Sequence, residues 1–388
     1  MNLNILHCVL DEKFVDPMID LTQQLWTDCI HNYVFVTENT SELRFITKSD
    51  FVTRIRPVDF VKIFKKTDYD VVVLHCFYSL RYNLITKIPS NIKVIWFAWG
   101  YDIYMPNYCH PALINIELYH ERTKEVLKGL KDKSFRTIVA EVYYRLFYKK
   151  AVEHAINRVD FFSGVIPEEY DMIKKNQKNK FFKAKQLIFN YNNPLYPYKK
   201  ECINDSVVEG FDIQIGNSAD SSNNHIDVFE KLSKYKLNDR KIIVPLSYAG
   251  TQRYKQMVIS EGEKCFGDIF IPLTDYMPLQ QYEKIISTSN YSIFCLERQQ
   301  AMGNIWFSLW RGCMVFLSET NPVYSHLINR GYKVFSIQND LIMIEQKARL
   351  AHKEVIRNRE LLIEEHSYDA EQKKAEVILR ELRNSVML

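Results

Sequence analysis

Short apolar runs alternate with amphipathic segments through both halves of the chain. In the first half, residues 18–26 and 58–64 have the apolar spacing of helices, and several runs have the length and composition of strands. The second half repeats this strand-then-helix rhythm. Strands that alternate with helices are typical of parallel, doubly wound sheets, so the pattern predicts an α/β protein with two such domains. The expected strands are residues 3–9, 33–36, 70–77 and 92–98, then 211–215, 242–246, 269–273, 291–296, 314–317 and 333–336.

The segments around these two regions have different patterns. Residues 113–156 are expected to be helical, and within 135–150 the apolar positions fall on one helix face while the other face is basic. Residues 189–210 are rich in Asn, Pro and Tyr and show no period, which indicates a linker. The sequence therefore predicts a first domain at 1–195, a linker at 196–210, a second domain at 211–345, and C-terminal helices at 346–388 that could pack back on the first domain.

Composition narrows the class of protein. A chain of 388 residues with 47% hydrophobic and 25% charged residues is long enough for two globular domains. Its net charge of +4 is too small to indicate nucleic-acid binding. The eight cysteines are scattered without a C-x-x-C pair, which suggests buried thiols in a reducing compartment. The N-terminus has no signal-peptide pattern, and no apolar run approaches the ~18 residues of a membrane span.

A glycine-led turn follows the first expected strand of the second domain. Small hydroxyl and amide residues at a helix start leave backbone N–H groups free, and such groups bind phosphate. An ordinary, well-capped turn between a strand and a helix would have the same composition. We expect a phosphate-binding role if neighbouring turns add further donors. The candidate donor-binding residues of this turn are Gly216, Asn217, Ser218, Asp220, Asn223 and His225.

Three further turns of the second domain carry polar and aromatic side chains. Because parallel strands all end at one edge of a sheet, these turns are expected to line one cleft together with the Gly216 turn. Asp275 and Tyr276 could hold a planar base, and Arg298 could neutralise a diphosphate. A surface salt bridge between Glu297 and Arg298 is the structural alternative. The candidate donor-binding residues of these turns are Tyr248, Arg253, Asp275, Tyr276, Arg298, Gln299, Gln300 and Gly303.

Absent motifs speak against two common classes of nucleotide-binding enzyme. The chain has no GxxxxGK[ST] loop and no GxGxxG fingerprint, which disfavours a nucleotide hydrolase and a dehydrogenase. A two-lobed glycosyltransferase fits better, with the sugar nucleotide in the second domain and the acceptor in the first. The triplet Asp68-Tyr69-Asp70 has the form of a metal-binding D-x-D, but it starts a buried strand and is expected to be structural. No metal or other cofactor is expected, because helix termini and Arg298 could neutralise the leaving diphosphate.

The first domain offers a candidate acceptor site. Trp99, Gly100 and Tyr101 follow a strand, at the sheet edge where open α/β proteins bind ligands. If transfer inverts configuration, a general base must lie within about 2.6–3.2 Å of the acceptor hydroxyl. Asp102 is the leading candidate, followed by Asp11 and by His75, which is more often a buried structural histidine. If configuration is retained, no single base is required and Asp102 could bind the acceptor instead.

Several of these residues form a pattern known from one enzyme family: Gly216-Asn217-Ser218, Asp220, Ser222-Asn223, His225-Ile226, Val244-Pro245, Tyr248, Arg298-Gln299-Gln300 and Gly303, with Trp99-Gly100 and Asp102 in the first domain. The pattern resembles glycosyltransferase family 56, the bacterial TDP-fucosamine (4-acetamido-4,6-dideoxygalactose) transferases of enterobacterial common antigen synthesis. The resemblance spans most of the chain in order and rests mainly on residues 216–226 and 298–303. Glu297 departs from it, because a small residue is expected there.

The resemblance implies a GT-B fold, in which two Rossmann-like domains face each other across a cleft. It also implies a nucleotide-diphosphate deoxy-amino sugar as donor and a polyprenyl-diphosphate-linked saccharide as acceptor. The protein would then be cytoplasmic and peripheral on the inner face of the cell membrane, with the basic, aromatic helix at 135–150 in contact with lipid. Two alternatives stay open, namely a non-catalytic sugar-nucleotide or glycan-binding protein and a GT-B-like sugar-nucleotide epimerase.

Overall fold

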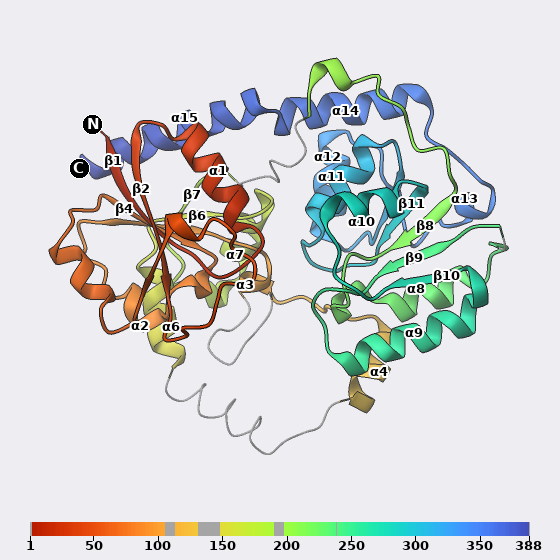
Figure 1. The fold of residues 1–388 in the computed structure, drawn as a ribbon, viewed down its shortest axis with the longest axis horizontal. Helices are drawn as coiled ribbons and strands as arrows, with labels where there is room; N and C mark the ends of the chain where they lie inside the picture. The colour runs from red at the N-terminus through yellow and green to blue at the C-terminus, as the bar shows by residue number, and fades with distance from the viewer. Residues whose placement is uncertain (1, 105–112, 131–147, 190–197, 238, 388) are drawn as a thin grey trace. The chain divides into compact units, whose positions relative to one another are not determined.

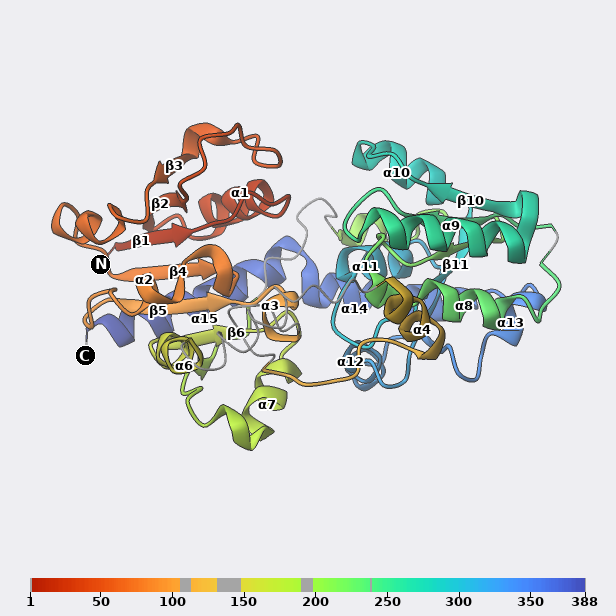
Figure 2. The same cartoon turned by 90° about the horizontal axis from the view of Figure 1, so that it is seen from below.

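The computed structural model describes residues 2–104, 113–130, 148–189, 198–237 and 239–387, and it divides into two compact units (Figure 1, Figure 2). Unit 1 contains Met1–Asn115, Lys133–Pro197 and Tyr368–Leu388. Unit 2 contains Ile116–Asp132 and Tyr198–Ser367. Each unit is built on one parallel sheet. The predicted α/β class with two doubly wound parallel sheets is therefore confirmed.

The sheet of unit 1 has seven strands in the order β3-β2-β1-β4-β5-β6-β7. All of its neighbouring strands pair in parallel. The strand order reverses between β1 and β4, which is the topological switch point of a doubly wound sheet. The strands are β1 (Leu3–Cys8), β2 (Cys29–Val36), β3 (Val52–Ile55), β4 (Val71–His75), β5 (Lys93–Phe97), β6 (Phe161–Ser163) and β7 (Lys185–Gln186).

Helices from both ends of the chain cover the sheet of unit 1. In α15 (Tyr368–Val386), Ala375, Ile378 and Leu382 are buried at helical spacing. They share a hydrophobic core with Leu21 and Leu25 of α1 (Val15–Leu25), which is why the last helix belongs to unit 1. The other helices are α2 (Tyr82–Ile85), α3 (Tyr101–Tyr104), α6 (Lys149–Asn157), α7 (Glu168–Lys175) and the short 3₁₀ turns η1 (Ser49–Phe51), η2 (Phe60–Lys65), η3 (Phe77–Ser79) and η4 (Gln177–Asn179).

The sheet of unit 2 has six strands in the order β10-β9-β8-β11-β12-β13, all paired in parallel. Strands β9, β11 and β12 are buried along their whole length, as expected where helices cover both faces of a sheet. The chain again starts near the middle of the sheet, and the order reverses between β8 and β11. The strands are β8 (Asp212–Ile215), β9 (Ile242–Pro245), β10 (Phe270–Leu273), β11 (Ser289–Phe294), β12 (Met314–Leu317) and β13 (Phe335–Ser336).

The helices of unit 2 form two layers. Figure 1 shows α8 (His225–Leu232), α9 (Gln252–Phe266) and α4 (Glu121–Leu130) on one side of the sheet, and α11 (Met302–Trp310) and α14 (His352–His366) on the other. The remaining helices are α10 (Leu279–Ile286), α12 (Pro322–Arg330), α13 (Ile342–Glu345), η5 (Lys200–Cys202), η6 (Ser221–Asn223) and η7 (Gly267–Ile269). This arrangement leaves the turns after β8, β9, β10, β11 and β12 at the carboxyl edge of the sheet.

Residues 116–132, which the sequence pattern assigns to the first domain, lie in unit 2. Asp227 of α8 accepts hydrogen bonds from the backbone N–H groups of Arg122 (2.9 Å) and Thr123 (3.0 Å), two otherwise unbonded donors in the first turn of α4. Apolar side chains of α4, among them Leu127, pack against the core of unit 2. A cap from a distant helix and an apolar face thus attach this segment to the second sheet.

Membrane-spanning helices and metal sites can be assessed only within the described residues. Among the helices of the described ranges, none has the length and apolar character needed to cross a bilayer. The same ranges contain no cluster of three or more His, Cys, Asp and Glu side chains that could hold a metal ion. Most of the predicted membrane-contact helix at 135–150 lies outside the described residues, which resume at Tyr148.

Candidate functional site

The turn after β8 is shaped by a glycine and by one asparagine. Gly216 has φ +69°, which residues with a side chain rarely adopt. A Cβ at this position would lie 2.8 Å from Asn223 Oδ1 and 2.9 Å from His225 Nε2. Asn223 Oδ1 accepts a hydrogen bond from the N–H of Asn217 (3.1 Å), and Asn223 Nδ2 donates to the carbonyl oxygen of Asp220 (3.1 Å). The glycine therefore lets the turn fold around the buried Asn223 side chain.

Several backbone N–H groups of this turn are already bonded within unit 2. Besides that of Asn217, the N–H of Ala219 donates to the carbonyl oxygen of Tyr248 (2.8 Å), and the N–H of Ser222 donates to Asp220 Oδ1 (2.8 Å). These three N–H groups are not free to bind phosphate, whereas the phosphate-binding role of the turn as a whole stays a prediction. These hydrogen bonds hold the backbone of the turn in place within unit 2.

Gln300 joins the turn after β8 to the run after β11. Ser222 Oγ donates to Gln300 Oε1 (2.9 Å), and Gln300 Nε2 donates to Asn217 Oδ1 (3.2 Å). Next to it, the Arg298 guanidinium donates to the carbonyl oxygen of Gln299 (3.1 Å), and both residues are buried. The structure thus brings together the two segments on which the sequence prediction mainly depended.

The other predicted donor-binding residues follow neighbouring strands of the same sheet. Arg253 is exposed in the first turn of α9, and Asp275 and Tyr276 are exposed after β10. His225 is buried at the start of α8, and burial lowers its pKa to about 4, so its imidazole is neutral at pH 7. Gly303 is half-buried in α11. Their roles in binding stay predictions.

An ion pair at this edge was not predicted from the sequence. Glu297, three residues after the end of β11, accepts a hydrogen bond from Nε2 of His120 (2.5 Å). His120 lies in the segment before α4. The hydroxyl of Ser318 donates to the same carboxylate oxygen (2.7 Å), and the hydroxyl of Thr320 donates to the other. Glu297 is therefore a fixed anion at the carboxyl ends of β11 and β12.

The ion pair is charged at neutral pH. Hydrogen bonds to Cys295 and Glu297 raise the pKa of His120 to about 10. The Cys295 contact is long, with 4.0 Å between its Sγ and His120 Nε2, and burial raises the thiol pKa, so Glu297 supplies the stabilising charge. Burial alone would raise the pKa of Glu297, but hydrogen bonds from His120, Thr320 and Ser318 lower it overall.

Asn224 positions His120 against the rest of the site. The backbone N–H of His120 donates to Asn224 Oδ1 (2.9 Å), and Asn224 Nδ2 donates to the carbonyl oxygens of Leu118 (3.1 Å) and Cys295 (2.9 Å). Asn224 has φ +50°, a left-handed conformation that asparagine tolerates better than most residues. One buried amide therefore connects α8, the end of β11 and the histidine segment.

A pocket of about 490 Å³ lies beside this ion pair. Its volume falls within the range of ligand sites, roughly 300–1,000 Å³. It is lined by Ile116, Glu117, Tyr119, His120 and Glu121 from the segment at the start of unit 2, and by Glu297 and Thr320 from the sheet edge. The carboxylate after an apolar strand was a usable sequence signal for Glu297. His120 offered none, because its segment joins unit 2 only through contacts distant in sequence.

Unit 1 encloses the leading candidate for the general base. Asp102 is fully buried, and its carboxylate accepts hydrogen bonds from Trp96 Nε1 (2.8 Å) and from the N–H groups of Phe77 (2.9 Å) and Trp99 (2.8 Å). Burial raises the pKa of Asp102 despite these bonds. The loop position of Asp102 did not predict this burial, which favours a structural role because the carboxylate has no exposed surface with which to reach an acceptor. Its role as general base stays a prediction.

The other two base candidates also have partners within unit 1. Asp11 accepts hydrogen bonds from three consecutive backbone N–H groups, at residues 44–46. His75 is fully buried, with its Nε2 2.9 Å from His7 Nδ1, and burial lowers its pKa to about 3. His7 in turn lies 2.9 Å from His31 Nδ1. These positions fit structural roles better than proton transfer to a substrate.

The predicted acceptor residues lie at the carboxyl end of β5. Trp99 is half-buried and its ring contacts that of Phe14, with 5.6 Å between centroids. Gly100 has φ +85° and starts the tight turn into α3. The hydroxyl of Tyr101 accepts a hydrogen bond from Cys76 Sγ (3.1 Å). Their acceptor role stays a prediction.

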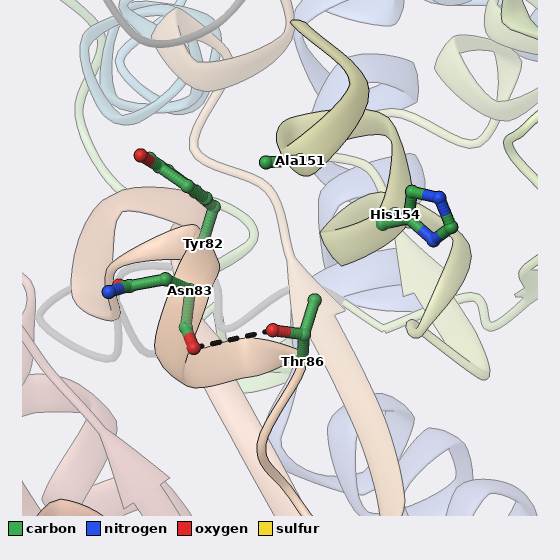
Figure 3. Close-up of a pocket in the computed structure, with 5 residues that line it drawn as sticks. All are labelled: Tyr82, Asn83, Thr86, Ala151 and His154. Atoms are coloured by element: carbon green, nitrogen blue, oxygen red, sulfur yellow. Dashed lines mark hydrogen bonds between the residues drawn. The ribbon is translucent and has the colours of Figure 1, made fainter. Parts of the chain in front are cut away.

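A pocket of about 320 Å³ lies between α2 and α6 of unit 1 (Figure 3). Thr86 Oγ1 donates to the carbonyl oxygen of Asn83 (3.3 Å). The side chain of His154 points away from those of Tyr82 and Asn83 (Figure 3). The polar groups that line this pocket do not converge on one point, as they would at a specific ligand site. We therefore assign the pocket no role.

Glycosyltransferases are among the solved structures with the same architecture. A glycosyltransferase from Rickettsia africae is 15% identical over 98% of this chain and 99% of its own, with a TM-score of 0.62. Sucrose-phosphate synthase from Thermosynechococcus elongatus is 10% identical over 99% of this chain and 100% of its own, with a TM-score of 0.63. The Anabaena protein HepE, in complex with UDP and glucose, is 10% identical with the same coverage and a TM-score of 0.60. At these identities the likeness establishes the fold, which is GT-B.

A family model identifies the activity class. The model described as "4-alpha-L-fucosyltransferase glycosyl transferase group 56" matches residues 135–368, more than half of the chain. The match contains the turn after β8, the run at 297–303 and the loop that carries Ser318 and Thr320. The chain therefore belongs to glycosyltransferase family 56.

Proposed function

We propose that this glycosyltransferase moves a deoxy-amino sugar, of the 4-acetamido-4,6-dideoxygalactose type, from a nucleoside diphosphate to a polyprenyl-diphosphate-linked saccharide in bacterial surface-glycan synthesis. Membership of family 56 supports the transfer of a deoxy sugar. The HepE structures, which contain UDP with glucose and UDP-glucose, support a nucleotide sugar as donor. The residues of the Gly216 turn and the Arg298 run support a donor site in unit 2.

One observation carries the donor assignment: Gln300 bonds to both Ser222 and Asn217, so the turn after β8 and the run after β11 form one surface. Arg298 stands two residues before Gln300 in the chain, is largely buried, and donates from its guanidinium to the carbonyl oxygen of Gln299. A guanidinium in a partly desolvated position stabilises the charge that develops on a leaving diphosphate more strongly than it would in water. We propose that Arg298 has this role and that no metal ion is needed for it.

The acceptor is proposed to bind unit 1 near Trp99, Gly100 and Tyr101. A lipid-linked acceptor would bring the protein to an anionic membrane surface, where each nearby Lys or Arg contributes about 1 kcal/mol. Unit 1 has an exposed basic cluster that suits such a surface, in addition to the basic residues at 135–150. The cluster consists of Lys174, Lys175, Lys178, Lys180, Lys183 and Lys185.

Arg298→Ala tests the donor site. We expect it to reduce transfer by about 10²–10³-fold, because removing one preorganised donor to a developing anion typically costs that much. The assay measures release of the nucleoside diphosphate and the mass gain of the lipid-linked acceptor. Exposed Arg357→Ala in α14 is the matched control and should transfer like the wild type. Full activity of Arg298→Ala would refute the phosphate assignment, and absence of transfer by the wild type would refute the proposed reaction.

A further inference from the structure

The pocket beside His120 and Glu297 combines apolar surface with fixed polar groups. Ile116 and Tyr119 give it apolar surface, whereas His120 and Thr320 give it polar groups. Specific sites for small molecules combine a mostly apolar wall with a few fixed polar groups in this way. The cluster of Glu297, His120 and the Ser318 and Thr320 hydroxyls is not used by the donor-diphosphate assignment above.

The order of the strands indicates which part of the donor reaches this pocket. Asp275 and Tyr276, proposed for the base, follow β10 at one side of the sheet. The proposed diphosphate residues follow β8 and β11, and Thr320 follows β12. A nucleotide sugar has its base, diphosphate and sugar in a linear sequence. With the base near β10 and the diphosphate near β8 and β11, the sugar falls on the β12 side.

His120 is prepared to donate a hydrogen bond at this position. Its Nε2 is bonded to Glu297, and no group in the described part of the chain hydrogen-bonds its Nδ1. Its side chain is 23% exposed, and that of Glu297 is 10% exposed. Because Glu297 keeps the ring cationic, both ring nitrogens carry hydrogen, and Nδ1 can only donate. The ring therefore selects an oxygen acceptor from a ligand.

The charges around His120 favour a neutral group over a phosphate. Glu297 and the thiol of Cys295 face the ring from the end of β11. Glu117 and Glu121 line the pocket from the histidine's own segment, and Lys124 lies 3.3 Å and 3.6 Å from their carboxylates. Three carboxylates against two cations leave the pocket slightly negative. A diphosphate would be repelled there, whereas hydroxyl and acetamido groups would not.

We propose that this pocket binds the sugar of the nucleotide-sugar donor and that His120 donates a hydrogen bond through Nδ1 to an oxygen of that sugar. The proposal rests on the function proposed above and adds the site that selects the sugar. The apolar wall of Ile116 and Tyr119 suits the methyl group at C6 of a deoxy sugar. Glu297, Ser318 and Thr320 hold the imidazole in place and are positioning residues.

The difference in affinity between a sugar nucleotide and the same nucleotide without its sugar tests this proposal. The probes are TDP and TDP-4-acetamido-4,6-dideoxygalactose, measured by calorimetry on the full chain. We expect the wild type to bind the sugar nucleotide more tightly than TDP, and His120→Asn to lose about 10- to 100-fold of affinity for the sugar nucleotide only. His352→Asn, an exposed histidine at the start of α14, is the matched control and should change neither affinity.

The pH dependence separates a binding role from a structural one. Without the carboxylate of Glu297, the pKa of His120 should return toward about 6.5, the ordinary value for histidine. Glu297→Gln should therefore lose the preference for the sugar nucleotide as the pH rises from 6 to 8, whereas the wild type should keep it. A merely structural effect would weaken the binding of both probes equally at every pH.

The outcomes distinguish this proposal from the proposed function. If the wild type prefers the sugar nucleotide and His120→Asn retains that preference while folded, the sugar-pocket proposal is refuted and the donor site stands. A preference in Glu297→Gln that does not change with pH would also refute it. If the wild type binds neither TDP, UDP nor their sugars, the proposed function fails and the pocket assignment fails with it.

Discussion

Gly216→Ala perturbs the turn after β8, where Gly216 packs against the Asn223 side chain in the proposed donor site. The added Cβ would lie 2.8 Å from Asn223 Oδ1 and 2.9 Å from His225 Nε2, distances that real Cβ atoms essentially never show. Asn223 would have to move, although it bonds to the backbone of Asn217 and Asp220 inside the turn. His225 is buried and has little room to move instead.

The free energy of unfolding that Gly216→Ala is expected to lose has two parts. The positive φ at Gly216 costs an alanine about 1–2 kcal/mol. Displacing Asn223 leaves buried polar groups without partners, which costs about 1–3 kcal/mol more. Gly331 separates the two parts, because it also has a left-handed conformation (φ +87°) but only the Arg357 guanidinium lies near its missing Cβ, at 3.8 Å. Gly331→Ala should therefore cost only the first part.

Calorimetric unfolding measures this difference. For a unit of this size, 1 kcal/mol corresponds to about 2–4 °C in Tm, so Gly216→Ala should unfold roughly 2–12 °C below Gly331→Ala. It should also weaken the binding of a nucleoside diphosphate, because the turn carries Asn217 and Ser222, the partners of Gln300. Equal Tm values for the two variants would refute the tight packing of Asn223 against Gly216. Unchanged nucleotide binding in Gly216→Ala would refute the role of the turn.

Two further predictions concern unit 1. The pKa values of His7, His31 and His75 are lowered mainly by burial, so their stabilising contribution is complete above pH 6.5 and is lost as the pH falls toward about 3. The Tm of unit 1 should fall over that range, and a constant Tm would contradict the buried neutral histidines. Asp102→Asn should lower the Tm of unit 1, because an amide leaves at least one of the Trp96 and Trp99 N–H groups unpaired, at a cost of about 1–3 kcal/mol. Loss of transfer without loss of stability would contradict the structural role of Asp102.

The fold could be predicted because both sheets have strong local signals. The apolar run of β4 and the regular strand–helix rhythm of unit 2 each specify parallel strands without help from distant residues. The shorter strands β3, β6 and β7 were missed. In β3, for example, Thr53 and Arg54 are exposed, so the segment lacks a buried run, and its pairing with β2 defines it.

The donor site was predicted only in part, for a physical reason. Gln300 and Asn217 each have a recognisable local pattern, and the parallel topology brings their turns to one edge. His120 has no such pattern, because its position depends on contacts that are distant in sequence. Asn224 and Asp227 accept hydrogen bonds from the backbone of the His120 segment, which lies more than a hundred residues earlier in the chain. The burial of Asp102 could not be predicted, because a loop position in the sequence does not reveal the three donors that enclose its carboxylate.

The central claim is a nucleotide-sugar site at the carboxyl edge of the unit 2 sheet. Its most direct test is whether a nucleotide stabilises the folded protein against thermal unfolding. A ligand at 100 times its Kd stabilises the folded state by about 2.7 kcal/mol, so a bound nucleotide should raise the Tm by several degrees. We predict that one nucleoside diphosphate and its deoxy-amino sugar raise the Tm of the wild type and that neither raises the Tm of Arg298→Ala. No shift with any nucleoside diphosphate, or an equal shift in the variant, would contradict the account.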